Sequence, residues 1–399
     1  MNKKAEKIDI VTLVMSVLLL ISFTIPNFMS YLKSRVNMPE PVSAQVVFGN
    51  FYWLALAIIA LFFVLSFVKT NNEKLNFLTG LLANICLILS VYFVGTRGDK
   101  LPFEYTESSR MSFNMGFVFM VISFYGIMLN CGRHLKKVWM SVINSALGWI
   151  VVLAMIPLGL LDNYSVMKEY AAHGTTFMDC FNQHISMCSK AIILSIIIGV
   201  PTGYWCYRHN IADKVIIFIL SIFETMPMLA LFALIRIPCA ALGDTFPFLA
   251  NFGVGSHGIS VSVIALTLYA LYLIVMNSRA GFAMVDKDYM ENASAMGMSP
   301  ARAFIRVQLP LALPVIFGGI RLAVINTFTA AALAAYFGGG GFGRYINIGI
   351  NGSALDCQLL GVIPIFVMTI IADLLMKGLI YVIQYFLGGN HNDNTAASV

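Results

Sequence analysis

Ten long apolar runs constrain this chain more than any other feature of its sequence. A helix needs about 20 apolar residues to cross the hydrocarbon core of a bilayer, and each run is close to that length. The runs cover residues 9–27, 48–68, 76–95, 111–131, 139–161, 185–206, 214–235, 257–277, 311–336 and 357–385. Charged residues make up only 11% of the chain, against roughly 25% in soluble domains. We therefore predict an all-α polytopic membrane protein with about ten transmembrane helices, and we exclude a soluble enzyme, a disordered chain and a nucleic-acid-binding protein.

The charges between the runs predict an orientation. If the N-terminus is inside, more lysine and arginine residues fall in cytoplasmic segments than in outer ones. We therefore expect a multi-pass membrane protein with both termini in the cytoplasm.

The two halves of the chain differ in character. Residues 1–161 contain five plain apolar runs with short loops, and residues 162–184 form a polar stretch that we expect to be an external connector. Residues 185–388 hold helix-breaking prolines, glycine clusters and a long polar cytoplasmic loop, and residues 389–399 form a polar tail. The first half contains no chemical motif, so an independent regulatory or assembly bundle remains one interpretation of it.

The polar loop at 278–310 carries the most informative pattern. Gly297 suits the end of a short helix, since glycine adopts a left-handed backbone freely. Ser299 can cap a second helix, with Pro300 in its first turn. We expect Pro310 to end that helix before the next span.

Two capped helices with exposed methionine and phenylalanine side chains favour an interaction element over an ordinary surface loop. Met296, Met298 and Phe304 are the predicted contact residues.

The same loop resembles the EAA motif of importer-type ABC transporter permeases. Glu291, Ala293, Gly297, Leu309 and Pro310 match that motif, although an asparagine follows Glu291 where the family has alanine. In the family, this motif forms the coupling helices that sit in a groove of the ATPase subunit. The resemblance therefore implies an ATPase-coupling site made of Glu291, Ala293, Met296, Gly297, Met298, Phe304, Leu309 and Pro310.

Other stretches are similar to the glycine betaine/osmoprotectant permeases within that family. The matching stretches are 224–232, 337–343, 360–364 and 372–373, so the resemblance covers about half of the chain. It implies a five-helix type I importer core, preceded here by five extra spans, as in the long osmoprotectant permease of enteric bacteria.

The implied partners are an ABC ATPase dimer that binds the ATP, a second permease subunit (a shorter paralogue or a second copy) and a solute-binding protein. The lipid bilayer is the remaining partner, and no nucleic acid is expected. The alternatives are an ABC permease for an amino acid or choline, and an ion-coupled secondary transporter, against which the coupling motif argues.

Five residues in or near the spans are candidates for the translocation pathway. Glu224 is an acid in or near a span, which favours either a pathway role or a structural hydrogen bond. Thr225 adjoins it, and Pro227 breaks the helix and frees backbone carbonyls. For Arg321 and Asp373 we prefer a structural role, in which each charge is paired or satisfied by backbone.

A glycine-rich stretch follows the ninth run, and its spacing matches G-x-G-x-x-G. It follows an apolar span and not a strand, so a nucleotide site fails its context test. We expect an outer turn or gate at Gly338, Gly340, Gly341 and Gly343. The sequence contains no P-loop and no metal-ligand spacing, so we expect no cofactor, no metal and no ATPase activity in this chain.

Overall fold

The structure is a computed structural model of the 399-residue chain. It describes residues 8–386 apart from 35–37, 69–71, 97–107, 247 and 249–257. The polar tail predicted at 389–399 and the N-terminal lysines that support the predicted orientation lie outside the described residues.

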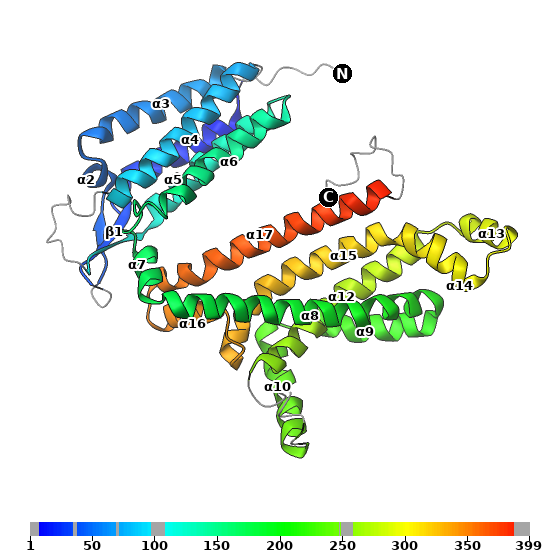
Figure 1. Ribbon diagram of the computed structural model, residues 1–399. Helices are drawn as coiled ribbons and strands as arrows, with labels where there is room; N and C mark the ends of the chain where they lie inside the picture. Colours follow the sequence, from blue (N-terminus) through cyan, green and yellow to red (C-terminus); the bar gives the residue numbers. More distant parts are fainter. Residues whose placement is uncertain are drawn as a thin grey trace. The chain divides into compact units, whose positions relative to one another are not determined.

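The described residues are mostly helical and divide into two compact units (Figure 1). The first unit contains Met1–His173 together with Ala354–Asp356. The second unit contains Gly174–Ser353 and Cys357–Val399.

The first unit is a helical bundle around an apolar core. Its helices are α1 (Ile10–Thr24), α2 (Ala44–Phe48), η1 (Gly49–Phe51), α3 (Tyr52–Val68), α4 (Glu73–Thr96), α5 (Met115–Arg133), α6 (Val138–Met155) and α7 (Ser165–Ala172). Leu19, Phe62, Leu87 and Met120 are fully buried between them. Asp9 caps α1, and Asn130 of α5 donates hydrogen bonds to both of its carboxylate oxygens, at 2.9 and 2.7 Å.

A small antiparallel sheet, which the all-α prediction missed, lies in the first unit. Its strands are β1 (Met29–Leu32), β2 (Glu40–Val42) and β3 (Arg110–Phe113), in the order β2-β1-β3. Strands of three or four residues are too short to show an alternating apolar pattern, and β3 comes from a distant part of the chain.

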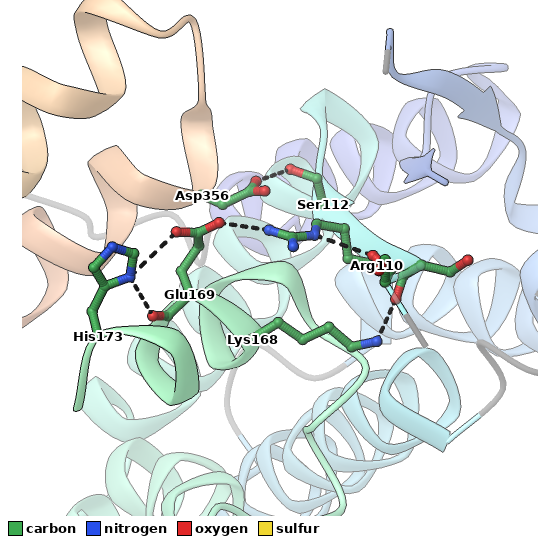
Figure 2. Close-up of polar contacts among 8 residues, drawn as sticks. Arg110, Ser112, Lys168, Glu169, His173 and Asp356 are labelled. Atoms are coloured by element: carbon green, nitrogen blue, oxygen red, sulfur yellow. Dashed lines mark hydrogen bonds and ion pairs between the residues drawn. The ribbon is translucent and has the colours of Figure 1, made fainter. Parts of the chain in front are cut away.

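A polar cluster joins β3 to α7 (Figure 2). Arg110 Nη1 lies 2.6 Å from Glu169 Oε1, and His173 Nδ1 lies 3.7 Å from the other oxygen of that buried carboxylate. Ser112 Oγ donates to Asp356 Oδ1 at 2.5 Å, a contact that ties 354–356 into the first unit.

In the second unit, α12 is the central helix and packs against α8, α9 and α15 (Figure 1). The elements of this unit are α8 (Gly174–Arg208), α9 (Asn210–Thr225), α10 (Met228–Thr245), α12 (Ile259–Ala283), α13 (Lys287–Ala295), α14 (Pro300–Ala303), the π-helical turn η3 (Phe304–Gln308), α15 (Leu309–Ala330), the 3₁₀ helix η4 (Ala331–Phe337), α16 (Gly343–Asn351) and α17 (Leu355–Phe386). Ala270 and Ile274 of α12 are fully buried in the same apolar cluster as Ala312 and Ile316 of α15.

Eight helical stretches of the described chain are long and apolar enough to cross a membrane. They are Ala44–Val68, Glu73–Thr96, Met115–Arg133, Gly174–Arg208, Met228–Thr245, Ile259–Ala283, Pro300–Phe337 and Leu355–Phe386. Ile10–Thr24 and Trp139–Met155 are shorter apolar helices that correspond to two further predicted spans.

Two predicted boundaries in the second unit are wrong. The run at 214–235 is not one helix, because the chain breaks at Met226 and Pro227 and the next helix extends to Thr245. The helix predicted from 185 begins at Gly174, so the second half of the predicted connector is helical. Residues 174–184 are largely polar, so no apolar run indicated this part of the helix.

Candidate coupling segment and translocation pathway

The coupling segment comprises residues 286–310, between α12 and α15, and begins with the short helix α13. Asp286 occupies the cap position, and its side chain accepts from the Asp288 N–H at 3.2 Å. Gly297 ends the helix with a φ of +80°, as predicted. Its N–H bonds the Ser294 carbonyl, and the Met298 N–H bonds the Ala293 carbonyl. These two bonds form a Schellman motif that turns the chain sharply.

The second helix of the segment does not end at Pro310, which corrects the prediction. Ser299 stands at the cap position without a side-chain cap bond, Pro300 opens α14, and the chain continues through η3 into α15. In η3 the Leu309 N–H donates to the Phe304 carbonyl five residues back. This wider turn accommodates Pro310, because proline lacks an N–H and its ring would clash with the preceding turn of a regular helix.

The side chains of the coupling segment divide into an exposed set and an anchoring set. Met296 is 77% exposed and Ile305 61%, Glu291 is exposed, and Met298 is half-buried. Ala293 is buried, with 4% of its surface exposed. Leu309 and Pro310 are half-buried at the start of α15.

Phe304 belongs to the anchoring set and not to the predicted exposed surface. Its ring lies 4.8 Å from the ring of Tyr204 in α8 and 5.9 Å from that of Phe282 in α12. The residue beside it, Ile305, is the exposed one, and the sequence analysis missed it.

An ion pair at the same end of α12 was also missed. Arg279 Nε lies 2.6 Å from Asp213 Oδ1, so the start of α9 is tied to the last turns of α12. The two residues are far apart in sequence, and each had an ordinary interpretation as a loop charge.

The pathway candidates fall at two places in the second unit. Glu224 and Thr225 end α9, and Pro227 precedes α10. Glu224 is half-buried, whereas Thr225 and Pro227 are exposed. The helix break predicted at the proline is therefore present, with Met226 in an extended conformation.

Arg321 and Asp373 form the other place, and they contact each other. Arg321 Nε of α15 donates to Asp373 Oδ1 of α17 at 2.5 Å. Lys377 lies 2.9 Å from the second carboxylate oxygen, one turn further along α17. The pairing agrees with the structural role that the sequence favoured for both residues.

The glycine turn lies at the far end of α15 from the coupling segment. Gly338, Gly340 and Gly341 have φ values of +78°, +73° and +72°, which only glycine adopts without strain. Gln183 of α8, which the sequence analysis missed, accepts the Gly341 N–H at 3.0 Å. A Cβ on Gly340 would lie 2.1 Å from Gln183 Oε1. The turn is therefore a packed element held by α8.

Gly343 begins α16 in equally close contact. A Cβ there would lie 1.8 Å from the Ala332 carbonyl oxygen. Phe342 and Tyr345 on either side are fully buried, and their rings contact Phe177 of α8. Desolvation raises the pKa of Tyr345 to about 12, so its hydroxyl stays neutral.

The described residues hold no group of three or more histidine, cysteine or acidic side chains that could bind a metal ion. The candidate site consists of an exposed two-helix segment at one end of α12 and α15 and a glycine turn at the other.

Comparisons with known proteins match this chain to a family of transport proteins. The model of the binding-protein-dependent transport system inner membrane component family matches residues 191–383. The choline transport system permease protein OpuBB of Bacillus subtilis (strain 168) is 34% identical over 191 residues, which cover 48% of this chain and 81% of that protein. The chain belongs to this family of ABC transporter permeases. It is an integral membrane protein and a transport component.

Two other relatives of this permease match the same half of the chain. The carnitine transport permease protein OpuCB of Listeria monocytogenes is 34% identical over 50% of this chain and 84% of its own length. The osmoprotectant import permease protein OsmW of Salmonella typhimurium is 34% identical over 49% and 86%, respectively.

The first half has a match of its own, because the N-terminal domain model of the ABC transporter permease YehY covers residues 6–167. Among solved structures, the inward-facing MetNI methionine ABC transporter aligns with a TM-score of 0.45 and 18% identity, over 53% of this chain and 98% of that chain.

Proposed function

We propose that this permease is the membrane-spanning subunit of an ATP-driven importer for osmoprotectants, such as glycine betaine and related quaternary ammonium solutes. The observation that carries the proposal is the coupling segment, a two-helix element between α12 and α15 in which Met296 and Ile305 are exposed. Relatives named for choline, carnitine and osmoprotectant transport support the class of solute.

The coupling segment would transmit the motion of a separate ATPase. ATP would bind to a dimer of ABC ATPase subunits, whose groove receives the exposed apolar side chains. The segment can pass on this motion because it is anchored to the spans through the ring of Phe304, which packs on Tyr204 of α8 and Phe282 of α12. ATP binding can shift the permease between two conformations only through contacts that differ between them. The contacts between the coupling segment and the ATPase groove would differ in this way.

The pathway would run past the break between α9 and α10, where Glu224, Thr225 and Pro227 lie. Arg321 and Asp373 would hold α15 to α17 during the alternation. The glycine turn would form part of an outer gate, near the place where a solute-binding protein delivers its ligand.

The assembly would need a second permease subunit, either a shorter paralogue or another copy of this chain, to enclose a pore. We place it in the bacterial inner membrane with both termini in the cytoplasm. The first five spans, predicted within 1–161, would be a separate bundle, and the permease core that follows would begin with α8 at Gly174.

Co-purification of the tagged chain from mild detergent tests the proposal. The wild type should retain an ATPase subunit, and Glu291→Arg and Gly297→Asp should lose it. Gly297→Asn is the matched control, because asparagine also tolerates the left-handed conformation but adds no charge. It should retain the ATPase.

The complex, reconstituted in vesicles with its binding protein, should import glycine betaine only when ATP is hydrolysed. Import that persists without nucleotide hydrolysis would support an ion-coupled transporter instead. If the complex imports an amino acid in preference to glycine betaine, the assignment as an ABC permease stands and the proposed solute is wrong.

A further inference from the structure

Strand β3 places two polar side chains on the same face of the small sheet. Arg110 and Ser112 are two positions apart in the strand, and successive side chains of a strand alternate between its faces. Arg110 contacts the buried carboxylate of Glu169 in α7, and Ser112 donates to Asp356 (Figure 2). One strand of the first unit therefore holds two different segments of the chain.

These two segments lead directly into the first and the last helix of the second unit. α7 ends at Ala172, and α8 begins at Gly174. Asp356 lies in the first turn of α17, which is a single helix of 32 residues. Residues 354–356 belong to the first unit, whereas the rest of α17 belongs to the second. The beginning of α17 is therefore attached to one unit, and its remaining length belongs to the other.

The strand is a firm support for this attachment. β3 pairs with β1 over all four of its residues, and the ion pair of Arg110 fixes it to α7. Glu169 and Asp356 are buried, with 3% and 6% of their surfaces exposed. A hydrogen bond to a charged group is stronger than one between neutral groups, and its loss leaves a buried charge uncompensated. The contact of Ser112 with Asp356 is therefore costly to break.

Within the second unit, α8 and α17 both contact the glycine turn close to their first residues. Gln183 of α8 accepts the Gly341 N–H. Gly361 of α17 packs so closely that a Cβ there would lie 2.7 Å from the Phe342 carbonyl oxygen. Further along, α17 is joined to α15 by the ion pair described above. Release of the first turn of α17 would therefore disturb both the turn and α15.

We propose that the first unit serves transport as an anchor, in which Ser112 holds Asp356, and through it α17, at the glycine turn while the coupling segment moves other parts of the core. The inference rests on the proposed function and gives the first unit a role in it. Ser112 and Asp356 are positioning residues, because they act through α17. Without the anchor, α17 moves together with α15, so less of each ATP-driven cycle changes the turn.

Cys357 is a native reporter of this attachment. It follows Asp356 directly and is fully buried, so a thiol reagent reaches it only when the first turn of α17 opens. In the purified complex, Ser112→Ala should increase the labelling rate of Cys357 by about tenfold, as expected when a hydrogen bond to a charged group is lost. Peptide mass mapping separates Cys357 from the other cysteines.

Ser30→Ala is the matched control for this variant. Ser30 lies opposite Ser112 in the sheet, is buried to the same degree, and its hydroxyl accepts from Asn114. The substitution removes a buried strand hydroxyl and leaves the contact with α17 intact. It should leave the labelling rate of Cys357 unchanged.

The same variants are compared for import by the complete complex in vesicles, with the binding protein present. Ser112→Ala should lower the amount of glycine betaine imported per ATP hydrolysed by about twofold to tenfold, the range set by a tenfold shift toward the released helix. Ser30→Ala should keep the wild-type value. Asp356→Ala should also lower it, and adding Ser112→Ala to that variant should change nothing further, because both substitutions remove one contact.

The outcomes separate the anchor from the proposed function. Unchanged labelling of Cys357 in Ser112→Ala would overturn the anchor. Faster labelling with unchanged import per ATP, or an equal loss of import in Ser30→Ala, would make the contact merely structural and overturn its role in transport. If the wild type imports no glycine betaine, the proposed function fails, and the labelling alone decides whether the anchor exists.

Discussion

Phe304→Ala tests whether the coupling segment is anchored as the structure indicates. Truncating a fully buried phenylalanine costs about 3–5 kcal/mol. The Phe304 ring is half-buried on Tyr204 and Phe282, so we expect about half of this, ~2 kcal/mol. For a unit of this size, that loss lowers the apparent melting temperature by about 4–8 °C.

The assay is thermal unfolding of the detergent-solubilised chain, followed by transport measurements on the complex. Ile305→Ala is the matched control, because the neighbouring side chain is 61% exposed and its truncation should change stability by less than about 0.5 kcal/mol. Phe304→Ala should also lower the amount of solute imported per ATP hydrolysed, since a loosely held segment transmits less motion.

Equal melting temperatures for the two variants would refute the anchoring argument. They would mean that Phe304 contributes no more packing than its exposed neighbour, and that the contacts with α8 and α12 do not hold the segment.

Two further predictions concern packing and charge within the second unit. Gly343→Ala should lower stability by about 3 kcal/mol or more, because its Cβ would overlap the Ala332 backbone. Gly318→Ala has nothing within 4 Å of its Cβ and should stabilise α15 by up to about 1 kcal/mol. Similar melting temperatures for the two variants would contradict this. Arg321→Gln should destabilise by about 1–2 kcal/mol, less than for a deeply buried pair, because the pair with Asp373 is partly exposed. Unchanged thermal stability would show that this ion pair does not hold α15 to α17.

Features that depend on local sequence were predictable. The apolar runs located the spans, because the length of an apolar stretch records the thickness of the bilayer. Gly297 was predicted to end a helix, and it does so: its N–H bonds the Ser294 carbonyl and the following Met298 N–H bonds the Ala293 carbonyl. The helix break at Pro227 likewise follows from one missing N–H.

Features that depend on distant contacts were not predictable from one sequence. The three-stranded sheet pairs Met29 with Phe113, and Gln183 reaches the Gly341 N–H from another helix. The packing of Phe304 likewise depends on Tyr204 and Phe282, which come from two other helices.

Within the candidate site, an ion pair could be predicted only where the position of a single charged residue in the sequence already required a partner. Arg321 and Asp373 are charges inside apolar runs, so the sequence predicted that each needs a partner. Their contact with each other was found only in the structure. Asp213 and Arg279 lie at the ends of spans, where charges are common, and nothing marked them as a pair.

Site-specific cross-linking from Met296 tests the central claim, that the coupling segment contacts an ATPase subunit. The seven native cysteines are buried or half-buried, so a cysteine introduced at this exposed position can be labelled selectively. The account predicts that Met296→Cys, with a short thiol-reactive cross-linker, joins the permease to the ATPase, and that Ile350→Cys, exposed on α16, does not. Cross-linking to the ATPase from Ile350 alone, or from neither position in an active complex, would contradict the claim.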